Sequence, residues 1–262
     1  MKISILGAGN VATQLALVLK KSGHQVVQIY NRSNDAGAEL AKTIGASFTS
    51  DLKQLEEADI YLIAVKDDAI AETGSVLKAG NRIVAHTSGS KSKDLLQDTS
   101  SNFGIFYPLQ TMTKAAKVDF KNVPLLVEGS NKQTTAKLEE LAKSISNNVH
   151  RVDEQQRQWI HIAAVFANNF TNHLFGISEQ LLVAHRLEFA ILKPLIFNFI
   201  QNLENHSPSQ IQTGPAVRGD FQTIEKHIQL LSDDMRLQKV YQILTESIIE
   251  QASKLNINNG PF

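Results

Sequence analysis

Apolar and polar residues follow two different rhythms along the first part of the chain. Short runs rich in β-branched residues are typical of buried strands, and an apolar residue at every third or fourth position is typical of an amphipathic helix. Strands are predicted at residues 3–6, 26–30, 60–65, 83–85, 104–107 and 125–127. Helices are predicted at residues 11–21, 36–44, 69–77 and 134–145, with a short turn at 52–56. Because strands that alternate with helices form βαβ crossovers, this part is predicted to be an α/β domain with a doubly wound, mostly parallel sheet.

The rhythm changes after residue 152. Residues 153–182 contain one glycine, Gly176, and no proline, and apolar residues recur there at helical spacing. This segment predicts one long helix or two consecutive helices. Further helices are predicted at residues 188–204, 221–231 and 235–255, because Ser207-Pro208 and Gly214-Pro215 between them cannot continue a helix. We therefore expect two domains, residues 1–152 and an all-α domain of residues 153–262.

Composition narrows the class of protein. The 262 residues include 26 Lys and Arg, 26 Asp and Glu, and no cysteine. Zero net charge argues against a nucleic-acid partner held by phosphate attraction, and the lack of cysteine excludes disulfides, thiol nucleophiles and iron–sulfur ligation. No His pair has the spacing of a helical metal site, so no metal is expected. The apolar stretches are too short for a membrane span and the N-terminus lacks a secretory signal, so we expect a cytoplasmic protein without membrane contact.

A glycine motif follows the first predicted strand and opens the first predicted helix. The motif is GAGNVA at residues 7–12. Gly7 permits a tight turn, and Gly9 lets the backbone approach a pyrophosphate, which the first helical N–H groups, those of Asn10 and Val11, can bind. The motif in this context predicts a dinucleotide site. The alternative is a glycine-rich turn that only connects strand and helix.

The end of the second predicted strand bears on the choice of dinucleotide. Where NAD-binding proteins usually have Asp or Glu for the ribose 2′-hydroxyl, this chain has Asn31, Arg32 and Ser33. A guanidinium can donate two charge-assisted hydrogen bonds to a 2′-phosphate, and its neighbours can add neutral ones. NADP(H) is therefore the expected cofactor. The alternative is a solvated turn in which Ser33 caps the next helix.

Two polar loops follow the predicted strands 60–65 and 83–85. The first begins with Val65 and Lys66, and the second is HTSGS at residues 86–90. In such sheets the ligand lies beyond the carboxyl ends of the strands, so Val65, Lys66 and His86 are expected beside the nicotinamide half of the cofactor. The segment 107–111 after the next strand should converge with these loops. Alternatively, the hydroxyl residues only form turns and His86 is a hydrogen-bonded loop residue.

The long helix predicted after residue 153 carries polar residues on an apolar background. At about 100° per residue, His161, Asn168 and Asn172 fall on one stripe. Polar groups in such a setting need partners, either in the facing domain or in a bound substrate. Since imidazole exchanges protons near neutral pH, His161 and His86 are the candidate proton donors, and Ser88 and Asn168 are expected to orient the substrate.

Seven segments together carry a resemblance to a known family. They are GAGNVA at 7–12, NRS at 31–33, AVKDDAI at 64–70, HTSGS at 86–90, YPLQT at 107–111, AAVFANNFTNHL at 163–174 and TGPAVRGD at 213–220. The chain resembles a bacterial family of Rossmann-like NADP oxidoreductases with a C-terminal helical domain of unknown function, related to pyrroline-5-carboxylate reductase and the F420-dependent NADP reductases. The resemblance implies an N-terminal dinucleotide domain, a helical domain like that of 6-phosphogluconate dehydrogenase, and a homodimer formed through the helices.

Two departures accompany this resemblance. The family more often has His where Tyr107 stands, and the wider hydroxyacid dehydrogenases have a catalytic Lys shortly before the helix Asn, where this chain has Ala164 and Val165. We expect an enzyme that transfers a hydride between NADP(H) and a small imine or carbonyl substrate bound between the domains. The alternative is a non-catalytic NADP(H) sensor or scaffold, which the missing Lys favours.

Overall fold

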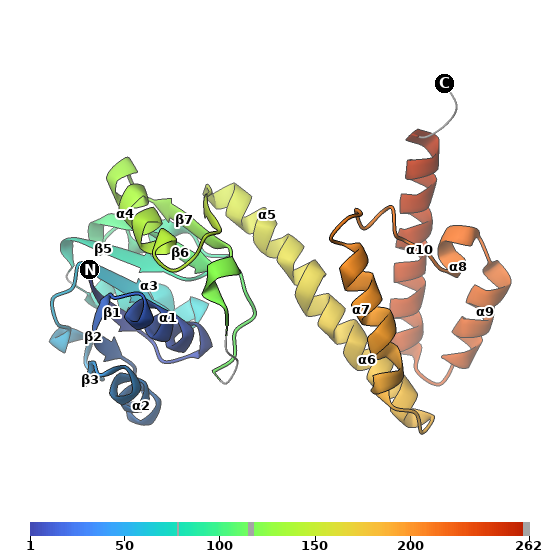
Figure 1. Ribbon diagram of the computed structural model, residues 1–262, viewed down its shortest axis with the longest axis horizontal. Helices are drawn as coiled ribbons and strands as arrows, with labels where there is room; N and C mark the ends of the chain where they lie inside the picture. The colour runs from blue at the N-terminus through green and yellow to red at the C-terminus, as the bar shows by residue number, and fades with distance from the viewer. Residues whose placement is uncertain (78, 115–117, 259–262) are drawn as a thin grey trace. The chain divides into compact units, whose positions relative to one another are not determined.

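The N-terminal part of the protein is built on one eight-stranded sheet (Figure 1). The computed structural model describes residues 1–77, 79–114 and 118–258. The strands are β1 (Lys2–Leu6), β2 (Gln25–Tyr30), β3 (Ser47–Thr49), β4 (Ile60–Ile63), β5 (Gly80–His86), β6 (Ser100–Pro108), β7 (Leu125–Gly129) and β8 (Val149–Arg151). They lie in the order β3-β2-β1-β4-β5-β6-β7-β8, and only the β6–β7 pair is antiparallel. The predicted mostly parallel sheet is thus confirmed.

Helices cover both faces of this sheet, as a doubly wound fold requires. On one face, α1 (Asn10–Lys21), α2 (Asn34–Ile44) and α4 (Lys132–Lys143) share a core with Ile5 and Phe106 of the sheet. On the other face, α3 (Ile70–Val76) and the 3-10 turn η3 (Lys93–Leu96) share a second core with Leu6 and Ile63. Ile5 and Leu6 enter different cores because successive side chains of a strand point to opposite faces.

Two short strands, β3 and β8, lie at the edges of the sheet and were not predicted. Each has three residues, which is too short a run to show a hydrophobic period. β5 and β6 also begin earlier than predicted, since their pairing starts at Gly80 and Ser100. The turn expected at 52–56 is the 3-10 turn η1 (Leu52–Gln54).

The strand order places the ends of β1 and β4 side by side. From β1 the chain goes to β2 on one side, and it later enters β4 on the other side. Leu6 and Ile63, the last residues of β1 and β4, are register partners, so both strands end at the same edge. In doubly wound sheets this reversal opens a crevice beyond the carboxyl ends of the strands.

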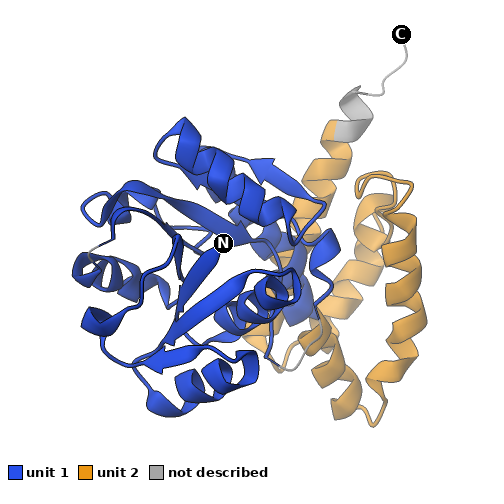
Figure 2. Ribbon diagram, turned by 60° about the vertical axis from the view of Figure 1, so that its left-hand side comes forward, with its two compact units in different colours: residues 1–174 blue, residues 175–262 orange. Residues whose placement is uncertain are grey.

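The chain forms two compact units, residues 1–174 and 175–262, which Figure 2 shows in blue and orange. Unit 1 holds the sheet, α5 (Glu154–Ala164) and the π-helical segment η5 (Val165–Phe170). The sheet ends at Arg151, next to the boundary expected at residue 152. The compact unit of the sheet also includes α5 and η5 and extends to Leu174. The domain boundary at residue 152 stays a prediction.

The C-terminal part of the described chain is helical, as predicted. Its elements are α6 (Thr171–Ala184), which follows η5 directly, the 3-10 turn η6 (Phe189–Leu192), α7 (Lys193–Asn202), α8 (Pro215–Arg218), α9 (Phe221–Leu230) and α10 (Met235–Asn258). The long helix expected from residue 153 is thus the run of α5, η5 and α6. α8 is a short helix within the segment that was expected to be a loop. Among the described residues, no helix has both the length and the apolar character needed to cross a bilayer.

Candidate functional site

The turn after β1 has the geometry of a phosphate cradle. Gly7 has a φ of +128°, and a Cβ on it would lie 2.3 Å from the carbonyl oxygen of Ala64, so only glycine fits there. A Cβ on Gly9, the N-cap of α1, would enter open space. α1 has no acidic residue in its first turn and no side-chain cap among the described residues, which leaves the N–H groups of Asn10 and Val11 for an anion.

The turn after β2 presents a cation at the same edge of the sheet. The Asn31 side chain donates a hydrogen bond to the carbonyl oxygen of Ser33 at 2.9 Å and so shapes the turn. Arg32 is exposed, and its guanidinium has no hydrogen bond or ion pair with any residue that the structure describes. Ser33 occupies the N-cap position of α2, but its hydroxyl makes no cap hydrogen bond within the described part of the chain. A guanidinium without a described partner in the turn after β2 can bind a 2′-phosphate.

These turns line one groove of about 460 Å³ at the edge where β1 and β4 end. Its walls include most of the predicted cofactor residues, namely Gly7, Gly9, Asn10, Val11, Asn31, Arg32, Val65 and Lys66. Ser33 and His86 are not part of the lining, whereas Thr87 is. The residues present fit a dinucleotide, because the space beside Gly9 and the free helical N–H groups lie in the same groove as Arg32.

His86, the predicted cofactor contact and proton donor, is fully buried at the end of β5. Its Nδ1 accepts a hydrogen bond from the backbone N–H of Ser88 at 3.2 Å, and its Nε2 donates to the carbonyl oxygen of Ser92 at 3.1 Å. These bonds occupy both nitrogens of a neutral ring, and burial lowers the pKa of His86 from 6.5 to about 4. A neutral ring without access to solvent cannot supply a proton to a substrate, so His86 shapes loop 87–92 instead.

The Ser88 hydroxyl also forms hydrogen bonds within the protein at this loop. Its Oγ donates a hydrogen bond to Oδ2 of Asp67 at 2.9 Å, and the Oγ of Ser90 donates to the same oxygen at 2.9 Å. Asp67 begins the 3-10 turn η2 (Asp67–Ala69) after β4 and lines the groove. Its carboxylate therefore joins the loops that follow β4 and β5. Asp67 was not predicted as a site residue, although it lies in the AVKDDAI segment directly after Lys66.

β6 and α5 bring Tyr107 and His161 into contact. The Tyr107 hydroxyl and Nδ1 of His161 are 3.1 Å apart, and the two rings meet edge to face with centroids 6.0 Å apart. Burial raises the pKa of Tyr107 above its ordinary value, so the hydroxyl keeps its proton at neutral pH. Nε2 of His161 has no hydrogen-bond partner in the described part of the chain. Tyr107 was not predicted as a site residue, although segment 107–111 was expected to converge with the loops.

Loop 87–92 connects this pair to the groove. A Cβ on Gly89 would lie 2.7 Å from Nδ1 of His161 and 2.7 Å from the Tyr107 ring, so Gly89 packs directly against both. Gly89 is two residues after Thr87, which lines the groove. Two residues of chain span at most about 7 Å. The Tyr107–His161 pair therefore lies close to the Thr87 end of the groove.

The π-helical segment η5 carries Asn168 to the loop after β6. Nδ2 of Asn168 donates a hydrogen bond to Oγ1 of Thr111 at 2.6 Å. Tyr107, Thr111, His161, Asn168 and Asn169 line a small cavity of about 180 Å³. A π-helix turns less per residue than an α-helix, so the stripe calculated with α-helical geometry does not continue through η5. The cavity lining consequently includes Asn169 but not the predicted Asn172.

Two family models match separate parts of the chain. The model described as NADP oxidoreductase coenzyme F420-dependent matches residues 2–89, and a model of a domain of unknown function (DUF2520) matches residues 123–248. The glutamyl-tRNA reductase of Sulfolobus acidocaldarius is 34% identical over 68 residues, which is 26% of this chain and 16% of that protein. The chain thus spans about one sixth of the length of the curated relatives it matches.

Solved structures extend the similarity to nearly the whole chain. Protein BF3122 of Bacteroides fragilis, for which an NADP oxidoreductase activity is proposed, is 36% identical, with 95% of this chain and 98% of that chain covered and a TM-score of 0.89. A pyrroline-5-carboxylate reductase from Coxiella burnetii shares the fold at 17% identity, with 97% of each chain covered and a TM-score of 0.58. An imine reductase from Myxococcus stipitatus in complex with NADP+ shares it at 15% identity, with 99% and 95% covered and a TM-score of 0.61. The chain therefore belongs to the family of Rossmann-like NADP oxidoreductases that carry a C-terminal DUF2520 domain.

Proposed function

We propose that this protein is an NADP(H)-dependent oxidoreductase acting on a small imine or carbonyl substrate. The observation that carries the proposal is the connection of the glycine-lined groove to the Tyr107–His161 pair through loop 87–92. Similarity in fold to reductases of C=N groups supports the choice of substrate class. The cavity beside the pair, about 180 Å³, suits a small molecule.

The residues of the groove would hold the cofactor in a defined orientation. The N–H groups at the start of α1 would bind the pyrophosphate, and the Arg32 guanidinium would bind the 2′-phosphate. The free N–H groups place partial positive charge where the phosphates would lie. Val65, Lys66 and Thr87 would border the part of the cofactor that lies beyond β4 and β5.

His161 is the proton donor in this proposal. When bound, NADPH supplies a hydride to the carbon of a C=N or C=O group, and the nitrogen or oxygen must gain a proton. In protonated His161, Nδ1–H can donate to the Tyr107 oxygen while Nε2–H delivers its proton to the substrate. The neutral ring that remains keeps the proton on Nδ1. The contact with Tyr107 thus selects which nitrogen exchanges the proton, and Asn168 and Thr111 provide neutral hydrogen-bonding groups for the substrate.

Replacement of His161 tests this role. In His161→Ala, kcat for NADPH oxidation with a responsive member of an imine and carbonyl panel should fall by about 10²- to 10⁴-fold, with unchanged NADPH affinity. His173→Ala is the matched control, because His173 is an exposed histidine on the same helical run and does not line the cavity. An unchanged kcat in His161→Ala would remove His161 from the mechanism.

A non-catalytic NADP(H) sensor is the second candidate function. It is favoured by Ala164 and Val165, which stand where the wider hydroxyacid dehydrogenases have a catalytic Lys. Stopped-flow measurements of bound NADPH with the same panel distinguish the two functions. Turnover of any compound supports the enzyme, and NADPH binding without turnover of any compound supports the sensor.

We also propose a homodimer formed through the helical part of the chain. In the described part of unit 2, the buried hydrophobic residues are Ala216 and Ile224, whereas Leu195 and Phe197 are 66% and 65% exposed. Large exposed apolar side chains are typical of a surface that associates. Light scattering should give twice the mass of one chain for the wild type, and Phe197→Glu should shift the protein toward the monomer. A monomeric wild type would contradict the proposal.

A further inference from the structure

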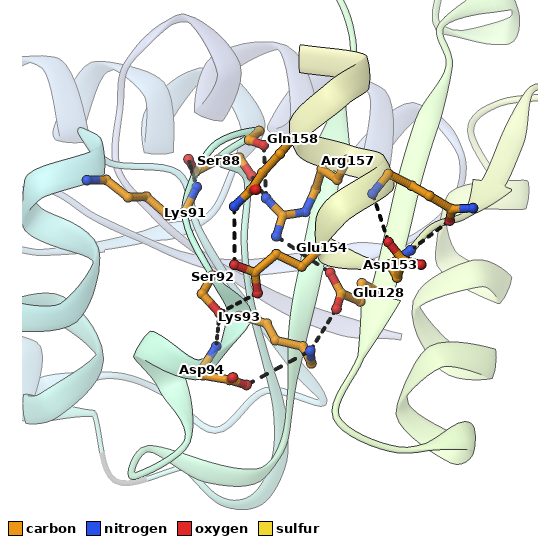
Figure 3. A network of polar contacts seen from close by, with 12 residues as sticks. Ser88, Lys91, Ser92, Lys93, Asp94, Glu128, Asp153, Glu154, Arg157 and Gln158 are labelled. Atoms are coloured by element: carbon orange, nitrogen blue, oxygen red, sulfur yellow. Dashed lines mark hydrogen bonds and ion pairs between the residues drawn. The ribbon is translucent and has the colours of Figure 1, made fainter. Parts of the chain in front are cut away.

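A charged network is buried where α5 meets the sheet (Figure 3). Arg157 of α5 is fully buried, and its Nη1 donates a hydrogen bond to the carbonyl oxygen of Gly89 at 2.9 Å. Its Nη2 lies 3.5 Å from Oε2 of Glu128 on β7. The other oxygen of Glu128 accepts a hydrogen bond from Nζ of Lys93 at 2.7 Å. The network therefore links α5, β7 and both ends of the segment from Gly89 to Lys93.

The carbonyl group that Arg157 holds belongs to the residue that packs against the Tyr107–His161 pair. The space for a Cβ on Gly89 is filled by Nδ1 of His161 and by the Tyr107 ring. Arg157 and His161 are separated by one turn of α5, so they lie on the same side of this helix. Displacement of the Gly89 backbone would consequently change its packing against the Tyr107 ring and against Nδ1 of His161.

Burying the Arg157 guanidinium carries a cost in folding free energy. Its Nε and Nη2, and Oε2 of Glu128, are buried without a hydrogen-bond partner among the described residues. A buried charge with unfilled donors disfavours folding, and apolar side chains of similar volume often do as well or better. What Arg157 does that an apolar side chain cannot do is to donate hydrogen bonds to the carbonyl oxygens of Gly89 and Ser88 and to face the carboxylate of Glu128 with its charge.

We infer that Arg157 is a positioning residue, which holds the Gly89 backbone against Tyr107 and His161 and so keeps Nδ1 of His161 in contact with the Tyr107 hydroxyl. Glu128 compensates the charge of Arg157, and Lys93 holds the carboxylate in place. The catalytic consequence of this inference rests on the proposed function, whereas the structural link between Arg157 and Nδ1 of His161 does not.

NMR of the full-length protein tests the link without a substrate. The ¹⁵N resonances of the His161 ring, assigned with His161→Gln, report the hydrogen bond at Nδ1, and Tyr107→Phe supplies their position when that bond is lost. In Arg157→Met, the Nδ1 resonance should move toward its position in Tyr107→Phe. Arg157→Lys should restore part of the wild-type position, since an ammonium group can still donate to Gly89.

Two further variants make the outcome decisive. Glu128→Gln keeps the shape of the side chain but removes the charge that faces Arg157, so it should move the Nδ1 resonance in the same direction as Arg157→Met. Arg151→Met is the matched control, because Arg151 is exposed and pairs with Glu139, and it should leave the resonance unchanged. An unchanged Nδ1 resonance in every folded variant of Arg157 and Glu128 overturns the inference.

Kinetics separate this inference from the proposed function. With an active panel compound, Arg157→Met should lower kcat by about 10- to 100-fold and leave the Kd for NADPH unchanged, which is the effect expected of a small displacement of reacting groups. A displaced Nδ1 resonance in a protein that never oxidises NADPH would retain Arg157 as a positioning residue and refute the oxidoreductase. Turnover with an unchanged Nδ1 resonance would support the oxidoreductase and refute the role of Arg157 as a positioning residue.

Discussion

Acid should destabilise this fold through one buried imidazole, that of His86. Burial lowers the pKa of His86 from 6.5 to about 4, and unfolding restores the ordinary proton affinity of the ring. The unfolded chain therefore takes up a proton at a higher pH than the folded chain. The stability that the neutral ring contributes is complete above pH 6.5 and is lost as the pH falls toward 4. Since a tenfold change in proton affinity corresponds to about 1.4 kcal/mol, His86 alone should lower the free energy of unfolding by about 3 kcal/mol.

Urea unfolding of the wild type and of His86→Gln at pH 7 and at pH 4.5 measures this contribution. Glutamine does not titrate in this range, and its amide can still donate a hydrogen bond toward the carbonyl oxygen of Ser92. The difference in unfolding free energy between the two proteins should shrink by about 2 to 3 kcal/mol at the lower pH. His24→Gln is a control, because burial and the N-terminal amine lower the pKa of His24 at a partly exposed position, so the change should be smaller. A difference that is the same at both pH values would refute the reasoning.

Four further predictions concern the groove and the core. Arg32→Ala should weaken NADPH binding about tenfold with little change for NADH, since an exposed charge-assisted hydrogen bond contributes about 1.5 kcal/mol, and equal wild-type affinities in fluorescence titrations would contradict this. Gly7→Ala should lower stability by about 1 to 3 kcal/mol, because its Cβ would lie 2.3 Å from the Ala64 oxygen. Gly9→Ala should leave Tm unchanged and weaken NADPH binding, so equal Tm values for the two glycine variants would count against the cradle. Phe106→Ala, at a fully buried position, should cost about 3 to 5 kcal/mol in urea unfolding, and a loss below about 1 kcal/mol would contradict its burial.

The fold follows from sequence patterns wherever a local rule applies. The alternation of short apolar runs with helical spacing predicts a mostly parallel sheet, because this period reports which side of each element is buried. Local patterns do not predict the antiparallel direction of β7 or the pairing of β3 and β8, since these depend on partners far along the chain. The π-helical segment η5 was not predicted either, and it alters which asparagines face the cavity.

Some features of the candidate site also follow from the local sequence, and others depend on contacts between distant segments. The turn at Gly7 and the cation at Arg32 lie directly after strands, so their place at the carboxyl edge follows from the element order. His86 also follows a strand, but its burial removes it from the solvent, and burial is not visible in the residues beside it. Tyr107 and His161 are 54 positions apart, and their contact depends on how α5 packs against the end of β6.

The amino-acid sequence alone thus determined the α/β class, the helical C-terminal part and the glycine-rich turn after β1, because each depends on residues that are close together along the chain. Only the tertiary structure decided that His86 is buried, that the Tyr107 hydroxyl contacts Nδ1 of His161, and that Arg157 donates a hydrogen bond to the carbonyl oxygen of Gly89. Burial and long-range contact set these properties. They arise when distant segments exclude water together, and the order of residues within any one segment does not encode them.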